Sequence, residues 1–389
     1  MTDRLYDNGM LMEFDAAVIS CTQIKKGYEV TLDRSAFFPE GGGQYGDVGT
    51  IAGVKVTDTY ERDGEVIHLC DAPLDAGAQV HGAVDKDIRL RRMQNHSGEH
   101  LLMGFIHDMT GFDNVGFHLG EDEVILDLNG VIEAEQLLEC ERRANRAIAE
   151  NVPFTISYPD EEELAALDYR SKLDLTENVR IVTIEGIDKC ACCAPHVQAA
   201  GQIGIIRVIS SENYKGGTRL RILCGMDAFE LIRQRMDSIR EISALLSAKP
   251  DKTVQHVKRL SDENISLKKQ LAELDRQKAQ SVIDSLANEG RGSFCVFTEG
   301  ISRDMMREIA NSAVLMTDGA AGVFGREDGG YSYIIASKNL PLRTMAKDIN
   351  SALDGRGGGS DEMIQGSAKA DRSTIEAYFG NISAVTQQR

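Results

Sequence analysis

The spacing of apolar and polar residues divides the chain into stretches of different character. From residue 1 to about residue 90, short runs rich in β-branched residues alternate with glycine and aspartate, which predicts the strands of a small β-barrel. These runs lie at 17–19, 28–32, 54–57 and 65–69. From 91 to 225 the pattern is mixed, with apolar residues at helical spacing in two segments and strand-like runs in three others. The helical segments are 93–109 and 133–149, and the strand-like runs are 124–126, 179–184 and 220–223.

The stretch from 226 to about 290 has helical character throughout, with a break near Lys249 and Pro250. Its second helix carries apolar residues at heptad spacing. One core position holds Val257, Asn264 and Leu271, and the other holds Leu260, Leu267 and Leu274. A short stripe with one polar member is typical of a two-helix hairpin or a dimer contact, and it also fits one helix packed on a neighbour.

Strand and helix patterns alternate in the last stretch. Strands are predicted at 293–297 and 333–336, helices at 303–315 and 342–353, and a glycine-rich segment follows at 355–359. We therefore expect an α+β chain of four parts. They are a β-barrel at 1–90, an α/β domain at 91–225, a helical hairpin or coiled coil at 226–290, and a C-terminal α/β domain at 291–389.

Composition narrows the class of protein. Apolar residues make up 42% of the 389 residues, and no run of 18 apolar residues predicts a transmembrane helix. The N-terminal residues lack a basic flank followed by an apolar run, so we expect a cytoplasmic protein without a membrane partner. The net charge of −18 argues against a general nucleic-acid coating protein, although it allows an enzyme with a local basic groove.

Two short motifs carry metal-binding side chains. His96 and His100 lie four apart on a predicted helix, so both imidazoles project from one face. Downstream, a segment with three cysteines ends in His196, and Cys192 stands four residues before that histidine. Two imidazoles, one thiolate and a third imidazole make a tetrahedral set that suits zinc. Spacing alone leaves Cys190 and Cys193 as competitors for the thiolate position.

The paired motifs His96-x-x-x-His100 and Cys192-x-x-x-His196 resemble the zinc motif of the alanyl-tRNA synthetase editing domain. Free-standing alanyl-tRNA editing proteins of the AlaX type, and the editing domain of bacterial threonyl-tRNA synthetase, share this motif. Further similarity to the alanyl branch lies in a Phe-Phe-Pro-Glu-Gly-Gly-Gly-Gln loop at 37–44 and in the segments 47–49, 215–219, 224–225 and 355–361. The resemblance covers nearly the whole chain and points to the long AlaX form.

The resemblance implies a function and a ligand set. It implies one zinc ion per chain, held by His96, His100, Cys192 and His196. It also implies hydrolysis of the ester that joins serine or glycine to tRNA(Ala), with the aminoacylated 3′ end of tRNA as partner. The chain departs from the family where Cys-Gly-Gly-Thr-His is usual, because Cys193, Ala194 and Pro195 follow Cys192. Glu99 stands where the family commonly has threonine, which bears on the amino-acid preference of the pocket.

Other residues are candidates for substrate contacts. Gly41, Gly42 and Gly43 allow the backbone to approach a ligand closely, and Gln44 could then hydrogen-bond a substrate carbonyl or ribose. The alternative is a tight turn within the barrel. Basic residues near the two motifs are candidate phosphate contacts, or merely a solvated face. They are Arg89, Arg91, Arg92, Lys215, Arg219 and Arg221.

Several alternatives remain open at this stage. The sequence His96-x-x-Glu99-His100 also fits a class of zinc peptidases in which the glutamate is the general base. A tRNA-binding module with a structural zinc is a second alternative. In an editing enzyme, Glu99 could contact the substrate's α-amino or hydroxyl group, hydrogen-bond a ligand histidine, or be a solvated helix residue. Residues 226–389 could mediate a homodimer or bind tRNA.

Overall fold

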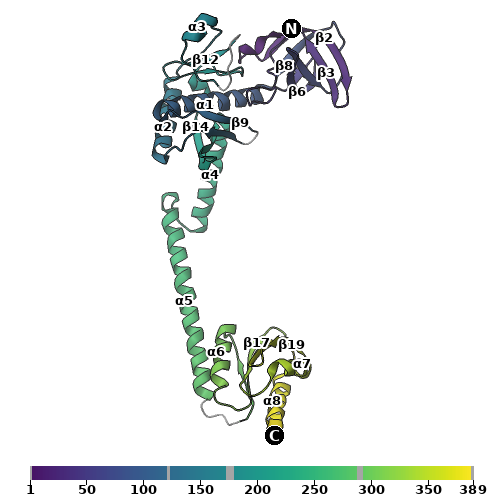
Figure 1. The fold of residues 1–389 in the computed structure, drawn as a ribbon, viewed down its shortest axis with the longest axis vertical. Helices are drawn as coiled ribbons and strands as arrows, with labels where there is room; N and C mark the ends of the chain where they lie inside the picture. The colour runs from purple at the N-terminus through teal and green to yellow at the C-terminus, as the bar shows by residue number, and fades with distance from the viewer. Residues whose placement is uncertain (1, 121–122, 172–178, 287–291, 387–389) are drawn as a thin grey trace. The chain divides into compact units, whose positions relative to one another are not determined.

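The computed structural model describes residues 2–120, 123–171, 179–286 and 292–386 (Figure 1). It contains two compact units, Met1–Glu241 and Ile242–Arg389. Helices and several separate sheets occur in the described ranges, which confirms the prediction of a mixed α+β chain. Residues 287–290, at the end of the predicted helical stretch, lie outside the described residues.

Six strands near the start of unit 1 close into a barrel in the order β2-β3-β7-β6-β5-β8. Their bounds are β2 Glu13–Ile24, β3 Gly27–Leu32, β5 Gly49–Ile51, β6 Val54–Arg62, β7 Glu65–Cys70 and β8 Gln79–Val84. Short elements β1 (Asp3–Arg4), η1 (Leu5–Asp7) and β4 (Arg34–Ser35) accompany them. Alternate residues of the strands point inward, so Val18, Val30 and Val56 are buried in one apolar cluster.

A buried histidine in this barrel predicts a pH-dependent stability. His68 is fully buried; its Nδ1 is 3.0 Å from the Val30 carbonyl oxygen, and its Nε2 is 2.7 Å from the Ser35 hydroxyl. A carbonyl only accepts, so Nδ1 carries the proton and Nε2 accepts from Ser35. Burial lowers the pKa of His68 from 6.5 to about 4. Between pH 6.5 and about 4, therefore, only the unfolded chain binds a proton at His68. The contribution of neutral His68 to the free energy of unfolding is complete above pH 6.5 and is lost as the pH falls from 6.5 towards 4.

We expect the free energy of unfolding to fall between pH 7 and pH 5, and to fall less in His68→Gln. The difference between the two proteins should be about 2 kcal/mol, because glutamine does not titrate in this range. Denaturant melts of both proteins at the two pH values measure it. An equal fall in both would show that His68 does not cause the acid sensitivity.

One long helix, α1 (Lys86–Thr110), follows the barrel and forms the centre of the rest of unit 1. Asp85 caps its first turn by accepting from the N–H groups of Asp87 and Ile88, and Gly111 ends it in a left-handed conformation. The predicted helix at 93–109 lies inside these bounds. Both faces of α1 are buried from Met93 to Ile106, so the polar residues of its histidine motif lie in the interior.

Among the described residues, two sheets and the helices α2 and α3 complete this part of unit 1. The four-stranded sheet has the order β14-β15-β10-β9, and the three-stranded sheet has the order β11-β12-β13. The strands are β9 Asn114–Leu119, β10 Val124–Leu128, β11 Phe154–Ser157, β12 Ile181–Ile184, β13 Asp188–Ala191, β14 Ile206–Tyr214 and β15 Gly217–Cys224. The remaining elements are α2 Ala134–Glu150, α3 Glu161–Ala166 and η2 Ala200–Ile203. Apolar residues of α1, α2 and both sheets form one core cluster.

Helix α4 (Gly225–Leu245) begins within unit 1, so the predicted boundary at 225 differs from the end of the unit at Glu241. The reason is a polar contact in its first turn. Asp227 accepts hydrogen bonds from Arg91 Nε at 2.9 Å and from Asn95 Nδ2 at 2.8 Å, which ties α4 to α1. A fragment intended to keep unit 1 intact should therefore end at Glu241.

Unit 2 contains η3 (Pro250–Lys252), the long helix α5 (Thr253–Leu286) and a five-stranded sheet in the order β16-β17-β18-β20-β19 (Figure 1). The strands are β16 Phe294–Thr298, β17 Ala320–Glu327, β18 Gly330–Ser337, β19 Gly355–Gly359 and β20 Met363–Ala368. The helices are α6 Arg303–Ala313, α7 Leu342–Ala352 and α8 Arg372–Thr386. The predicted helical break near Lys249 and Pro250 is confirmed. In the part of the chain that the structure describes, no helix is long and apolar enough to cross a bilayer.

The glycine-rich segment 355–359 is the edge strand β19, which the apolar pattern did not predict. Glycine has a low preference for strands, so the segment lacks the usual signal. Close packing explains its composition, since a Cβ on Gly357 would lie 2.2 Å from the Tyr333 hydroxyl oxygen. A larger residue there would displace the edge strand from its neighbour β20.

Candidate metal centre

The four residues of the two motifs converge at one place in unit 1. His96 and His100 project from α1, while Cys192 and His196 lie on the loop that follows β13. Their ligand atoms all lie within 4.8 Å of one another. Cys192 Sγ is 3.7 Å from His96 Nε2 and 3.3 Å from His196 Nε2.

The two sulfur–nitrogen separations fit a tetrahedral metal ion. Zinc bonds of about 2.0–2.3 Å place neighbouring ligand atoms about 3.3–3.8 Å apart. The cluster could therefore hold a metal ion, and its nitrogen and sulfur donors suit zinc. Among the described residues, the candidate metal-binding cluster includes Cys192 and neither of the competing thiols, Cys190 and Cys193.

Burial determines the charge of the ligands. The three histidines are at most 4% exposed. Burial raises the pKa of the Cys192 thiol. Burial, followed by the neighbouring His100 and His96, holds the pKa of His196 well below its usual range. Both shifts favour neutral groups, so a bound cation is what would make a thiolate stable at this depth.

Two histidines of the cluster have a hydrogen-bond partner on Nδ1, while their Nε2 atoms face the Cys192 thiol. His96 Nδ1 is 2.9 Å from Gln44 Oε1, and His196 Nδ1 is 3.0 Å from Ser97 Oγ. An amide oxygen only accepts, so His96 carries its proton on Nδ1 and leaves Nε2 for a metal. The Ser97 hydroxyl also accepts from the Val197 N–H. Ser97 was not among the predicted residues, because a partner 99 positions away has no spacing signal.

His100 lies between two carboxylates. Its Nδ1 is 3.9 Å from Asp188 Oδ2, and its Nε2 is 3.8 Å from Glu99 Oε2, both beyond hydrogen-bond range. Asp188 is held in place by Arg170, which donates to both of its oxygens at 2.8 and 2.6 Å. The sequence analysis did not single out Asp188 or Arg170, since only the fold brings them to His100.

Glu99 is 4% exposed, so the alternative of a solvated helix residue is wrong. Its Oε1 accepts a hydrogen bond from the side-chain amide of Asn114 on β9. The position of Glu99 within α1 explains this, because α1 is buried on both faces at the histidine motif. Asn114 thus belongs to the polar surroundings of the cluster, and the sequence analysis missed it.

The glycine-rich segment is a tight turn that places Gln44 against His96. Gly41 and Gln44 exchange two backbone hydrogen bonds, both of 3.0 Å. Gly43 has φ +82°, and a Cβ on it would lie 2.7 Å from the Phe117 ring. The Leu119 N–H of β9 also donates to the Gly43 carbonyl at 3.1 Å. The predicted tight turn is therefore confirmed, and contact of this loop with a substrate stays a prediction.

Of the six basic residues predicted to face phosphate, Arg89 is fully buried, so that prediction is wrong for Arg89, and Arg221 pairs with Glu123 at 3.1 Å. The other four also make contacts within the chain. Arg91 pairs with Asp227, and Arg92 donates to the Gly46 carbonyl oxygen at 2.7 Å. Arg219 on β15 forms two 2.7 Å hydrogen bonds with Asp127 and lies over the Tyr214 ring. The neighbouring Lys215 Nζ is 5.0 Å from the centre of that ring. None of the four belongs to the metal cluster.

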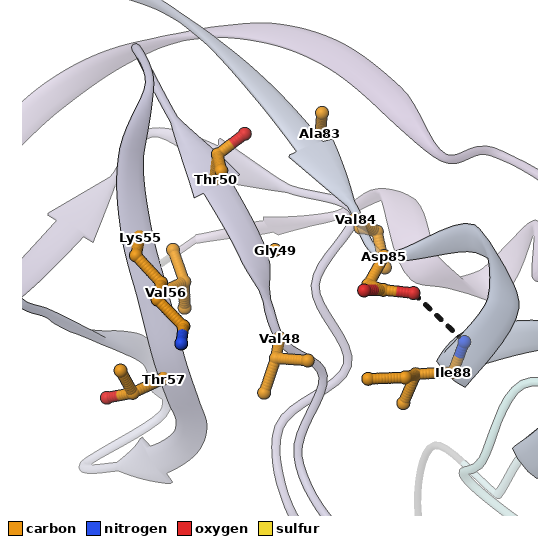
Figure 2. Close-up of a pocket in the computed structure, with 10 residues that line it drawn as sticks. All are labelled: Val48, Gly49, Thr50, Lys55, Val56, Thr57, Ala83, Val84, Asp85 and Ile88. Carbon is orange, nitrogen blue, oxygen red and sulfur yellow. Dashed lines mark hydrogen bonds between the residues drawn. The ribbon is translucent and has the colours of Figure 1, made fainter.

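An open groove of about 710 Å³ lies on the barrel, beside the start of α1 (Figure 2). Figure 2 shows Val48 and Gly49 between Lys55 of β6 and Asp85, whose carboxylate bonds to the Ile88 N–H. Its lining includes no metal-cluster residue and no predicted substrate-binding residue. The groove is therefore a separate feature of the surface.

Comparison with known proteins finds several that are similar to this chain. Residues 179–222 match the family described as the threonyl and alanyl tRNA synthetase second additional domain. The chain is 27% identical to the alanyl-tRNA editing protein AlaX-L of Pyrococcus horikoshii, over 96% of each protein. It is 26% identical to the alanyl-tRNA editing protein Aarsd1 of Danio rerio, over 95% of each protein.

A longer relative is the alanine–tRNA ligase of Methanopyrus kandleri. It is 28% identical over 94% of this chain, which corresponds to 42% of the ligase. Among solved structures, the C-Ala domain of Aquifex aeolicus alanyl-tRNA synthetase matches 24% of the chain at 16% identity with a TM-score of 0.21, too weak to carry an argument. Over nearly its whole length, therefore, the chain is similar to alanyl-tRNA editing proteins, and it is also similar to part of an alanine–tRNA ligase.

Proposed function

We propose that the chain is a zinc-dependent trans-editing hydrolase that deacylates tRNA(Ala) mischarged with serine or glycine, in the cytoplasm. The convergence of His96, His100, Cys192 and His196 carries the proposal, because it joins motifs 92 or more residues apart into one donor set. Its support from relatives is their shared name, alanyl-tRNA editing protein, across nearly the full chain.

The need for such an activity follows from binding physics. A pocket that accepts alanine cannot strongly exclude the smaller glycine, because one methyl group gives only about 10- to 200-fold discrimination. Serine differs from alanine only by an added hydroxyl group, and an apolar pocket also rejects such an addition poorly. A second site that hydrolyses the wrong ester therefore raises the accuracy of charging.

The metal ligands and their hydrogen-bond partners would supply the chemistry. A zinc ion held by His96, His100, Cys192 and His196 would supply a Lewis acid for the ester or help to orient the substrate. Four protein ligands fill a tetrahedral shell, which favours the orienting role. Gln44 Oε1 accepts a hydrogen bond from His96 Nδ1 and so orients that ring. The Nε2 of Gln44 is buried and has no hydrogen-bond partner among the described residues. That N–H₂ group can donate to the substrate carbonyl, and Glu99 can accept from the substrate's ammonium or hydroxyl group.

Contacts with the tRNA are proposed at the turn and at basic side chains. The Gly41–Gly43 backbone would approach the acylated 3′ end, because this turn lies beside Gln44. Lys215 and Arg219 lie at the hairpin between β14 and β15, beside the aromatic ring of Tyr214, and Arg91 lies on α1. A cationic group near an aromatic ring suits a phosphate-bearing single strand.

The test is deacylation by the purified protein of Ser-, Gly- and Ala-tRNA(Ala), offered in parallel with and without a zinc chelator. We expect hydrolysis of the seryl or glycyl ester, little hydrolysis of the alanyl ester, and loss of activity with the chelator. Binding of tRNA without any hydrolysis would favour a tRNA-binding module with a structural zinc. A zinc peptidase is not favoured, because Cys192 and His196 lie within the donor set.

We also propose that unit 2 self-associates through α5. The predicted stripe makes little contact with the rest of unit 2. Exposed fractions are 47% for Val257, 55% for Leu260, 62% for Leu267, 65% for Leu271 and 55% for Leu274. Heptad spacing makes a second copy of α5 the matching surface, and Asn264 can fix the register.

Two leucine-to-lysine substitutions are expected to separate the dimer. Leu267→Lys combined with Leu274→Lys places charges at core positions, so sedimentation should show a dimer for the wild type and a monomer for the variant. The matched control is Ser266→Lys with Glu273→Lys, one position earlier on the helix, which should remain dimeric. A monomeric wild-type protein would contradict the proposal.

A further inference from the structure

Helix α1 carries arginines as well as metal ligands along one side. Arg89, Arg92, His96 and His100 follow one another at intervals of three or four residues, which places them in line on a helix. The two histidines reach the metal cluster, while the two arginines reach the segment that leads out of the glycine-rich turn. One rigid element therefore contacts both the metal cluster and the turn.

Asp47 is the point where the arginines meet that segment. Its carboxylate is buried, accepts from Arg89 Nε at 2.9 Å, and lies 3.7 Å from Arg92 Nη1. It also accepts from the Phe38 N–H at 2.7 Å, while the Asp47 N–H donates to the Phe38 carbonyl. These contacts close residues 38–47 into a loop whose base is pinned to α1.

Arg92 makes the contact closest to the turn itself. Its Nη1 donates to the Gly46 carbonyl at 2.7 Å and lies 3.4 Å from the Tyr45 carbonyl. Only 13% of its side chain is exposed, and Asp47, which also pairs with Arg89, lies 3.7 Å away. Two residues before Gly46, Gln44 bonds to His96, one helical turn beyond Arg92 on the same helix.

We propose that Arg92 is a positioning residue for the reaction at the metal centre. By holding Tyr45 and Gly46 against α1, it keeps Gln44 in contact with His96 and keeps the unpartnered Gln44 Nε2 in a fixed place. The proposal rests on the proposed deacylase function. In it, Arg92 holds the turn from inside the protein and does not contact a tRNA phosphate. A guanidinium that is 13% exposed and bonded to backbone carbonyls has little surface to offer a phosphate.

The test compares Arg92→Gln and Arg92→Lys with the wild type in the full-length, zinc-loaded protein. Steady-state kinetics on the tRNA ester hydrolysed by the wild type should show kcat lowered about 10- to 100-fold in Arg92→Gln, with KM nearly unchanged. Arg92→Lys should recover part of kcat, because an ammonium can still donate to the Gly46 carbonyl. The salt dependence of tRNA binding should be the same in all three proteins.

Backbone hydrogen exchange provides a second readout that does not depend on activity. Peptides covering residues 40–46 should exchange faster in Arg92→Gln, while peptides of α2 should not change. The control is Lys86→Gln, which removes one positive charge from the same helix at a side chain that is 65% exposed and paired with Glu13. This control should alter neither kcat nor exchange at residues 40–46.

Each outcome bears on the proposal. A raised KM with unchanged kcat, together with a salt dependence weakened by about one phosphate contact, would show that Arg92 binds the tRNA backbone and would overturn it. Unchanged kcat and unchanged exchange would also overturn it. If the wild type hydrolyses none of the esters, the deacylase function fails, and faster exchange in Arg92→Gln still reports whether the turn is held by this residue.

Discussion

Replacing Cys192 with alanine is expected to abolish zinc binding and to lower deacylation by about 100-fold or more. The thiol lies 3.3 Å from His196 Nε2 and 3.7 Å from His96 Nε2, so its loss removes the sulfur donor and leaves three imidazoles. His100→Ala should act in the same way from the helix side. Metal analysis of the purified variants, together with a chelator-competition measurement of zinc affinity, tests the expectation.

Cys193→Ala is the matched control for the loss of a thiol. Cys193 neighbours Cys192 but lies outside the candidate metal-binding cluster, and its side chain lies beside the turn, 3.6 Å from the position of a Cβ on Gly42. We expect this variant to keep its zinc. Full zinc occupancy in both Cys192→Ala and His100→Ala would show that the ion is held elsewhere and would refute the ligand assignment.

Glu99→Thr is expected to keep zinc and hydrolysis but to shift the preference between seryl and glycyl esters about tenfold. The carboxylate is buried beside His100 and bonded to Asn114, and it lies in the polar surroundings of the cluster without being one of the four ligands. A charge-assisted hydrogen bond from a serine hydroxyl would distinguish the two substrates. Values of kcat/KM for both esters, measured in wild type and variant, give the shift.

Glu99→Gln separates charge from shape at this position. It keeps an oxygen that can accept from Asn114 but removes the negative charge, so a preference shift similar to that of Glu99→Thr would assign the effect to the charge. Complete loss of hydrolysis with zinc intact would instead identify Glu99 as the general base. An unchanged preference in both variants would limit the role of Glu99 to its hydrogen bond with Asn114.

Local patterns in the sequence predicted most of the helices, several of the strands and the four residues of the candidate metal cluster. Repeating apolar positions predicted α1, α2, α6 and α7, because a helix buries residues at fixed intervals whatever lies beside it. The break before α5 followed from Pro250. The candidate cluster was predictable because both pairs use the four-residue spacing that can bring donor atoms to one metal, and because imidazole and thiol side chains are chemically distinctive.

Only the tertiary structure decided how these ligands are supported. Ser97, Asp188 and Asn114 are ordinary polar residues whose partners lie far away in the sequence, so no local pattern marks them. The direction of the Arg92 side chain was equally hidden, since a charged residue beside a motif fits a phosphate contact as well as a backbone carbonyl. The sequence also did not predict that the α5 stripe is exposed, because heptad spacing is the same whether the partner is a neighbouring helix or a second chain. The spacing of apolar residues determines which face of a helix or strand is apolar. Which residues pack against that face depends on chain segments that only folding brings together.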